Sequence, residues 1–332
     1  MSCWFEVKKP EIVISSRIRL ARNINGLPFP SMMNEQQFKK LNALVRDAIN
    51  KSDDKLVKSL KYIEMSNVPE IERFAMVERH IISKRFALNY QNRAILISDD
   101  ESICIMLGEE DHIRVQVLRA GLSLDDAYDT ANLIDDVLCE GLDISFDERI
   151  GFLTECTTNL GTGLRASVML HLPLLELNRE ISNLIDAISK VGFAVRGMYG
   201  EGTKALASLY QLSNQITLGI SEKSAIENIK SVAMQLIEKE NNYRKQLNSL
   251  KIEDRCMRSY GVLKNARILT SNELLQRASD VMLGVYLGII DNEIWPMKLL
   301  VETQPYMLMK KVGEMSSESR DIERATFVRN LL

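Results

Sequence analysis

Cysteine is scarce in this chain of 332 residues, which contains five: Cys3, Cys104, Cys139, Cys156 and Cys256. Their number is odd, their spacing is wide, and no CxxC pair or Cys/His cluster occurs. The pattern excludes a zinc-ribbon site and a disulfide scaffold, so we expect reduced thiols. Four of them fit the role of small buried apolar residues, whereas Cys156 lies in a segment rich in glycine and threonine.

Long hydrophobic runs are also missing from the sequence. No stretch of about 18 apolar residues occurs, which excludes a membrane-spanning helix. Residues 1–11 lack the apolar centre of a signal peptide. We therefore expect a cytoplasmic protein that does not enter a membrane. The formal net charge of -3 argues against a general nucleic-acid-binding protein, so we expect no direct contact with nucleic acid.

The composition that is present, 45% hydrophobic and 26% charged residues, is that of a globular protein. The periodic patterns predict a β-hairpin at 94–98 and 103–107, helices at 34–50, 123–140 and 174–191, and strands at 193–202 and 215–219. Strands are linked by hairpins and do not alternate strictly with helices, which favours an α+β fold. We predict an antiparallel sheet flanked by helices in residues 11–241, followed by a helical C-terminal domain in residues 242–332.

Residues 155–172 (ECTTNLGTGLRASVMLHL) hold the most informative pattern. A turn rich in glycine leads to Arg165, which opens an alternating, half-buried strand. Exposed backbone N–H groups and a guanidinium both suit a phosphate, so the pattern fits an anion site. Taken alone, it fits a purely structural turn as well.

Further arginines stand at predicted strand ends or turns, at positions 17, 19, 114 and 196. Arg17 and Arg19 are two residues apart and project from one face of a strand. Acidic side chains accompany them at Glu109, Glu110 and Glu201. Neither a GxxxxGK[ST] loop nor the protein-kinase HRD and DFG motifs occur. A cage of arginines could stabilise a transferring phosphoryl group instead.

Four segments in this order resemble the motifs of the ATP:guanido phosphotransferase (phosphagen kinase) family: residues 15–19 (SSRIR), 109–114 (EEDHIR), 156–168 (CTTNLGTGLRASV) and 196–201 (RGMYGE). The resemblance covers residues 11 to 220 and implies Mg²⁺-ATP as the phosphoryl donor. The ATP-binding residues that it implies are Ser15, Ser16, Arg17, Ile18, Arg19, His80, Arg114, Arg165, Ala166, Ser167, Val168, Met169, Arg196, Gly197, Met198, Tyr199, Gly200 and Glu201. No residue is expected to be a dedicated metal ligand.

By the same resemblance, Glu110, Glu201 and Cys156 are the catalytic residues. A guanidinium is not nucleophilic while protonated, so a carboxylate must orient it and accept its proton. Glu110 is the better candidate for the base and Glu201 for the orienting group, with a thiolate at Cys156 adding electrostatic support. Thr157 departs from the family, which usually has proline after the cysteine.

The substrate is expected to be arginine in proteins. Family members that act on small guanidino compounds carry about a hundred helical residues before the first motif, which begins here at Ser15. An open site suits an arginine on a protein surface, as in the bacterial branch of the family. Two alternatives remain: a kinase of free arginine or a similar small guanidino compound, and an adaptor that binds phosphoarginine without catalysis.

Residues 320–325 (RDIERA) resemble an RDxxRA motif with which that branch binds phosphoarginine. Arg320 and Arg324 share a helical face, Asp321 could meet the ligand's guanidinium, and Ala325 completes the motif. A charged surface helix is the alternative. The resemblance further implies an allosteric role for phosphoarginine and a function in the stress response. It also implies a homodimer or higher homo-oligomer, substrates passed to a Clp ATPase and protease, and a zinc-finger activator.

Overall fold

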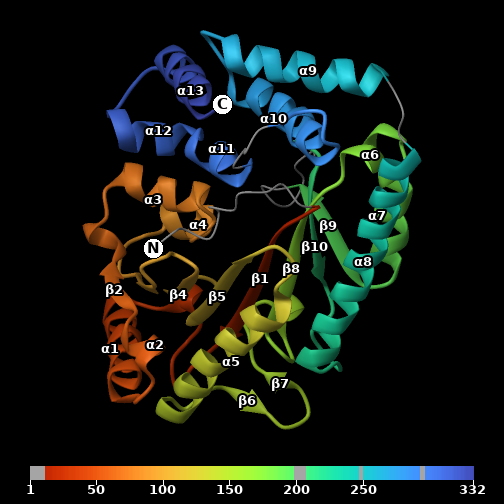
Figure 1. Ribbon diagram of the computed structural model, residues 1–332. Coiled ribbons are helices and arrows are strands. Elements are labelled where there is room, and N and C mark those ends of the chain that lie inside the picture. The colour runs from red at the N-terminus through yellow and green to blue at the C-terminus, as the bar shows by residue number, and fades with distance from the viewer. Residues whose placement is uncertain (1–11, 198–206, 247–249, 292–295) are drawn as a thin grey trace.

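An eight-stranded antiparallel sheet forms the centre of the computed structural model, which describes residues 12–197, 207–246, 250–291 and 296–332. The strand order is β2-β3-β4-β5-β1-β8-β10-β9 (Figure 1). The strands are β1 (Val13–Arg22), β2 (Lys61–Glu64), β3 (Ala94–Ile97), β4 (Ile103–Leu107), β5 (Ile113–Ala120), β8 (Leu164–His171), β9 (Phe193–Gly197) and β10 (Leu209–Asn214). A separate ribbon joins β6 (Phe146–Asp147) and β7 (Gly151–Phe152). The predicted antiparallel sheet is confirmed.

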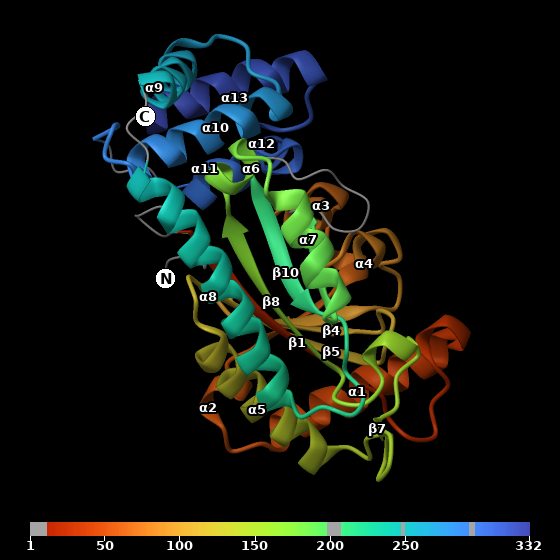
Figure 2. The ribbon, with the colours of Figure 1, turned by 90° about the vertical axis from the view of Figure 1, so that its right-hand side faces the viewer.

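Helices flank the sheet and also form the whole C-terminal part (Figures 1 and 2). They are α1 (Glu35–Lys51), α2 (Lys55–Lys58), α3 (Glu70–Glu78), α4 (Lys84–Leu88), α5 (Leu124–Gly141), α6 (Pro173–Leu177), α7 (Ile181–Lys190), α8 (Glu222–Gln246), α9 (Leu250–Asn265), α10 (Ser271–Tyr286), α11 (Pro296–Glu302), α12 (Pro305–Val312) and α13 (Ser317–Leu331). The division predicted at residues 241 and 242 falls within α8.

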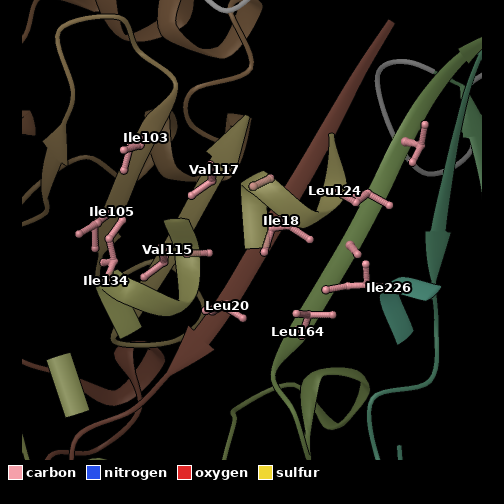
Figure 3. Packing of buried hydrophobic residues seen from close by; sticks show 14 of the residues in the cluster. Ile18, Leu20, Ile103, Ile105, Val115, Val117, Leu124, Ile134, Leu164 and Ile226 are labelled. Atoms are coloured by element: carbon pink, nitrogen blue, oxygen red, sulfur yellow. The ribbon is translucent and has the colours of Figure 1, made fainter. Parts of the chain in front are cut away.

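One face of the sheet packs against α1, α5 and α8 to form the largest hydrophobic core. Ile18 and Leu20 of β1 and Val115 and Val117 of β5 point into this core and are almost fully buried (Figure 3). Each such side chain stabilises the fold by about 1.5–3 kcal/mol. Side chains alternate along a strand, and Arg17 and Arg19 flank Ile18. The two arginines must therefore project from the opposite face of the sheet.

Two sequence-based element predictions were wrong in detail. The last strand ends at Asn214, and the predicted strand at 215–219 is irregular, with Ile216 and Leu218 half exposed. Its apolar residues are not buried, and Thr217 instead binds the loop before β8 through its carbonyl and hydroxyl oxygens. The helix predicted at 174–191 is two helices, α6 and α7, because the chain turns at Arg179 with φ 58°.

The C-terminal helices share a hydrophobic core with the remaining face of the sheet. Ile14, Leu118, Met169 and Leu209 belong to the same cluster as apolar residues of α9, α10, α11 and α13. A second contact joins α3 to α12, where the Glu78 carboxylate accepts hydrogen bonds from the backbone N–H groups of Tyr306 (3.0 Å) and Met307 (2.8 Å). The sheet and the C-terminal helices are therefore joined by a shared hydrophobic cluster and by the hydrogen bonds of Glu78.

His171 provides a pH-dependent contact between the sheet and α10. Its Nε2 lies 2.9 Å from Ser279 Oγ, and burial lowers the pKa of His171 from 6.5 to about 3. The unfolded chain therefore binds a proton near pH 6.5 that the folded chain does not, so this group's contribution to stability is lost as the pH falls from 6.5 toward 3. We expect His171→Gln to lose less stability than the wild type between pH 7 and pH 5.

Urea denaturation of both proteins at several pH values measures this difference. All other titrating groups are common to the two proteins and cancel in the comparison. Parallel stability curves would show that His171 already takes up a proton in the folded protein.

Candidate active site

Antiparallel pairing brings the predicted arginines onto one face of the sheet. Arg19 of β1 is directly opposite Arg165 of β8, and Arg17 is opposite Ser167. On the other side of β1, Ala21 is opposite Arg114 of β5. Directly opposite residues project from the same face. The strand register therefore gathers Arg17, Arg19, Arg114 and Arg165 within three neighbouring strands.

These guanidinium groups repel one another in a buried setting. Burial, followed by Arg165 and Arg114, lowers the pKa of Arg17 to about 10. Burial, followed by Arg17, Arg114 and Arg165, lowers the pKa of Arg19 well below its ordinary value. In the part of the chain that the structure describes, the Nε atoms of Arg17 and Arg19 are buried without a hydrogen-bond partner. Such a cluster favours a polyanion as its ligand.

The two adjacent glutamates differ in their surroundings. Glu109 is buried, accepts a hydrogen bond from Ser83 Oγ, and lies 2.7 Å from Arg114 Nη1. Burial alone would raise the pKa of Glu109, but Arg114 and Ser83 hold it below its usual value. The Glu110 carboxylate is more exposed and lies 3.5 Å from the same Arg114 nitrogen. Glu109 thus holds Arg114, while Glu110 remains accessible to a substrate.

The loop that carries Cys156 is tied to the residue after Glu110. Asp111 Oδ1 accepts hydrogen bonds from Glu155 N (2.9 Å) and from Asn23 Nδ2 (2.7 Å). The Cys156 thiol is partly exposed and lies 3.0 Å from Thr158 Oγ1. Asp111 lies within the EEDHIR segment, whereas Asn23 belongs to none of the four motifs. Their side chains bring the thiol loop and Glu110 into one region.

The same loop needs glycine at its far end. Gly161 has φ +105°, and a Cβ there would lie 2.4 Å from the carbonyl oxygen of Thr217. Its backbone is therefore packed directly on the segment after β10. This contact explains why a glycine-rich turn precedes Arg165, and it gives that turn a structural role beside the arginine cluster.

His80 reaches the cluster from the turn after α3. Its φ of 61° is left-handed, and its carbonyl oxygen accepts a hydrogen bond from Gln116 Nε2 (2.8 Å). Burial, followed by Arg17, lowers the pKa of His80 to about 4, so its ring is neutral at pH 7. A cleft beside it is lined by Ser15, Arg17, His80, Leu118, Ser167, Met169, Gln211 and Met297. Gln211 and Met297 carried no signal in the sequence motifs.

The remaining predicted ATP-binding residues divide into three groups. Side chains of Ile18, Ala166 and Val168 lie on the opposite face, in the main core, and Ser16 Oγ donates a hydrogen bond to the carbonyl of Gly121. Arg196 on β9 pairs with Gln211, and Gly197 with Tyr210. Met198, Tyr199, Gly200 and Glu201 lie outside the described residues.

The RDxxRA segment is part of α13. Arg324 is 1% exposed and donates hydrogen bonds to the carbonyl oxygens of Thr303 (2.9 Å) and Leu269 (2.8 Å) and to Asp321. Ala325 is fully buried, whereas Arg320 is partly exposed. In this arrangement Arg324 fastens α13 to its neighbours. A phosphoarginine site here stays a prediction.

The described residues lack two further features. Those residues form no helix with the length and apolar character needed to span a membrane. They also contain no cluster of three or more His, Cys, Asp or Glu side chains with the arrangement of a metal site.

The antiparallel sheet with its cluster of arginines agrees with the fold of the ATP:guanido phosphotransferases. A family model of the ATP:guanido phosphotransferase C-terminal catalytic domain matches residues 40–243, and one of the protein-arginine kinase McsB C-terminal domain matches residues 249–332. The chain belongs to the protein-arginine kinase family, a group of enzymes with a guanidino acceptor.

Curated relatives cover nearly the whole chain. A protein-arginine kinase of Caldanaerobacter subterraneus subsp. tengcongensis is 45% identical over 323 residues, which cover 96% of each chain. That of Clostridium acetobutylicum is 43% identical over 334 residues, or 98% of each chain.

Solved structures of similar fold include the duplicated taurocyamine kinase of Schistosoma mansoni with bound transition state analog components. Its TM-score is 0.63 at 26% identity, and the match covers 80% of this chain and 38% of that one. The chain therefore spans well under half of that duplicated protein. Lombricine kinase, at 24% identity and a TM-score of 0.58, shows the same fold over 69% of this chain and 66% of its own.

Proposed function

We propose that the protein transfers the γ-phosphoryl group of ATP to the guanidino group of arginine residues in proteins. The observation that carries this proposal is the cluster of Arg17, Arg19, Arg114 and Arg165 beside an accessible Glu110. The cluster supplies positive charge where negative charge spreads over a transferring phosphoryl group. Glu110 supplies a carboxylate where the acceptor nitrogen must lose a proton.

Each catalytic residue has a distinct task in this proposal. Glu110 orients the acceptor guanidinium and accepts its proton as the N–P bond forms and the bond from the γ-phosphorus to the bridging oxygen of ADP breaks. Glu201 holds the other side of the guanidinium. Cys156, as a thiolate, adds negative potential beside the guanidinium. The loop that carries Cys156 is held by the hydrogen bond from Glu155 N to Asp111. The arginines keep the phosphates in line with the acceptor.

Magnesium would reach the site bound to ATP. The described residues offer no cluster of three metal-ligating side chains, and Mg²⁺ is commonly held by substrate phosphates, water and one or two carboxylates. When bound, the ion neutralises phosphate charge and adds to the electrostatic stabilisation that the arginines provide.

Family membership supports a proposal about the wider role of the protein. We propose a cytoplasmic kinase whose catalytic domain comprises residues 11–241 and whose helical domain, residues 242–332, binds phosphoarginine through Arg320, Asp321, Arg324 and Ala325 and regulates activity. Its products would be proteins marked for a Clp protease in the stress response, with a zinc-finger protein as activator. A homodimer or higher oligomer fits a site that binds phosphoarginine on a sister subunit.

A comparison of two acceptors tests the proposed reaction. The protein is incubated with Mg-ATP and either an unstructured protein rich in arginine or free arginine, and acid-labile phosphate is measured. A P–N bond is acid-labile, whereas phosphoserine is not. We expect label on the protein acceptor and little on free arginine. Label on free arginine alone would identify a small-molecule guanidino kinase. No label in either, together with tight phosphoarginine binding, would identify an adaptor.

A further inference from the structure

A side chain from the C-terminal helices reaches the cleft beside the arginine cluster. Among the described residues that line this cleft, Met297 alone comes from this part of the chain. Met297 lies in the first turn of α11 and is 5% exposed. The other lining residues belong to β1, β5, β8, β10 or the turn after α3. A residue far away in the sequence thus completes a site otherwise built by the catalytic sheet.

The lining of the cleft changes from charged to apolar. Arg17 is its one permanently charged residue, and it belongs to the arginine cluster that suits phosphates. Leu118, Met169 and Met297 provide apolar surface, and the His80 ring is neutral. A thioether interacts favourably with an aromatic ring. An uncharged, polarisable wall next to a phosphate site fits the base of a nucleotide.

The cleft must widen to admit a base. The space that water can enter in this cleft is about 30 Å³, which is too small for a purine ring. Methionine is unbranched and has three rotatable side-chain bonds, so it adapts its shape more easily than other apolar residues. Met169 and Met297 are therefore the lining residues best suited to move aside and then pack on an entering ring.

Two further contacts fix α11 at the cleft. Met297 belongs to the same hydrophobic cluster as Leu118 and Met169, so sheet and helix share one core. The next helix, α12, is held by the hydrogen bonds from its first turn to Glu78, two residues before His80. Both ends of the α11–α12 segment are thus packed against elements that line the cleft.

We propose that Met297 is a nucleotide-binding residue that packs its thioether against the base of ATP. The C-terminal helices then form part of the donor site itself. This inference rests on the proposed function, because it takes the cleft beside the arginines as the place where ATP binds. It assigns a direct substrate contact to a residue outside the catalytic domain predicted from the sequence.

Binding measurements on full-length protein test the contact without relying on catalysis. We expect Met297→Ala to weaken Mg-ADP binding about tenfold, the effect of losing a buried apolar contact. Binding of tripolyphosphate, which has no base, should change by less than about twofold. Met297→Leu retains an apolar contact and should bind Mg-ADP within about threefold of the wild type. Calorimetry gives all of these constants.

Met282→Ala is the matched control. Met282 is 1% exposed and belongs to the same cluster but does not line the cleft. It should lose stability without a change in Mg-ADP affinity. Should Met297→Ala fail to fold, Met297→Gln keeps the unbranched length and should also weaken Mg-ADP selectively.

Two results would overturn the inference alone: an unchanged or tighter Mg-ADP complex in Met297→Ala, or an equal loss of tripolyphosphate binding. A wild-type protein that binds neither Mg-ADP nor Mg-ATP would overturn the proposed function together with it. The two failures are therefore distinguishable.

Discussion

Glu110→Gln is expected to reduce kcat for phosphoryl transfer about a thousandfold, within the range for loss of a general base. Glutamine keeps the size and one acceptor oxygen of the side chain but cannot take the proton of the acceptor guanidinium. Because Glu110 lies 3.5 Å from Arg114 and is not the main partner of that arginine, Mg-ADP affinity should stay within about twofold. Steady-state kinetics and calorimetry measure the two quantities.

Glu109→Gln is the informative control for this prediction. Glu109 is the 2.7 Å partner of the largely buried Arg114, so its replacement removes the closest countercharge of that guanidinium and should lower the melting temperature. Glu110→Gln should leave the melting temperature nearly unchanged. If Glu110→Gln kept more than a tenth of the wild-type kcat, the proton acceptor would have to be another group.

Arg19→Met is expected to stabilise the protein while it removes activity. Arg19 is partly exposed, but its Nε atom is buried, and desolvation together with three neighbouring arginines holds its pKa well below the ordinary value. Replacing such a charge with an apolar side chain of similar length should raise the free energy of unfolding by about 1–2 kcal/mol. Activity should fall by at least about a hundredfold, because one donor to the phosphates is lost.

Chemical denaturation and the arginine-phosphorylation assay test the two parts of this prediction separately. Arg258→Met is the control, because Arg258 is exposed on α9 and pairs only with Asp254 among the contacts that the described residues show. It should change neither quantity. Added tripolyphosphate should stabilise the wild type more than Arg19→Met. A less stable Arg19→Met would mean that attraction to Glu109 outweighs the repulsion among the arginines.

Local sequence patterns were sufficient where one element determines the outcome. The helix predicted at 34–50 is α1, and Asn34 and Gln37 form a capping box at its start. The hairpin at 94–98 and 103–107 is β3 and β4. The prediction at 215–219 failed because alternating apolar residues do not distinguish a strand from an extended loop fixed by polar contacts such as those of Thr217.

The candidate site was predictable only in part. Arg17 and Arg19 were expected on one face from their spacing, and the structure confirms this placement. The position of Arg19 opposite Arg165 depends on the pairing of β1 with β8, which includes a register shift between Val13 and Ser15. Asn23, Gln211 and Met297 belong to no motif, and tertiary packing alone brings them to the site.

The core shared by the sheet and the C-terminal helices limits how this enzyme can be divided. A chain cut after residue 241 would keep every proposed catalytic residue, yet Ile14, Leu118, Met169 and Leu209 would lose the apolar side chains of α9, α10, α11 and α13 that share their cluster. The exposed apolar surface would favour aggregation over correct folding. The boundary between the two family models therefore does not mark a place where the chain can be divided, and we expect the two parts to fold, and to be engineered, as one unit.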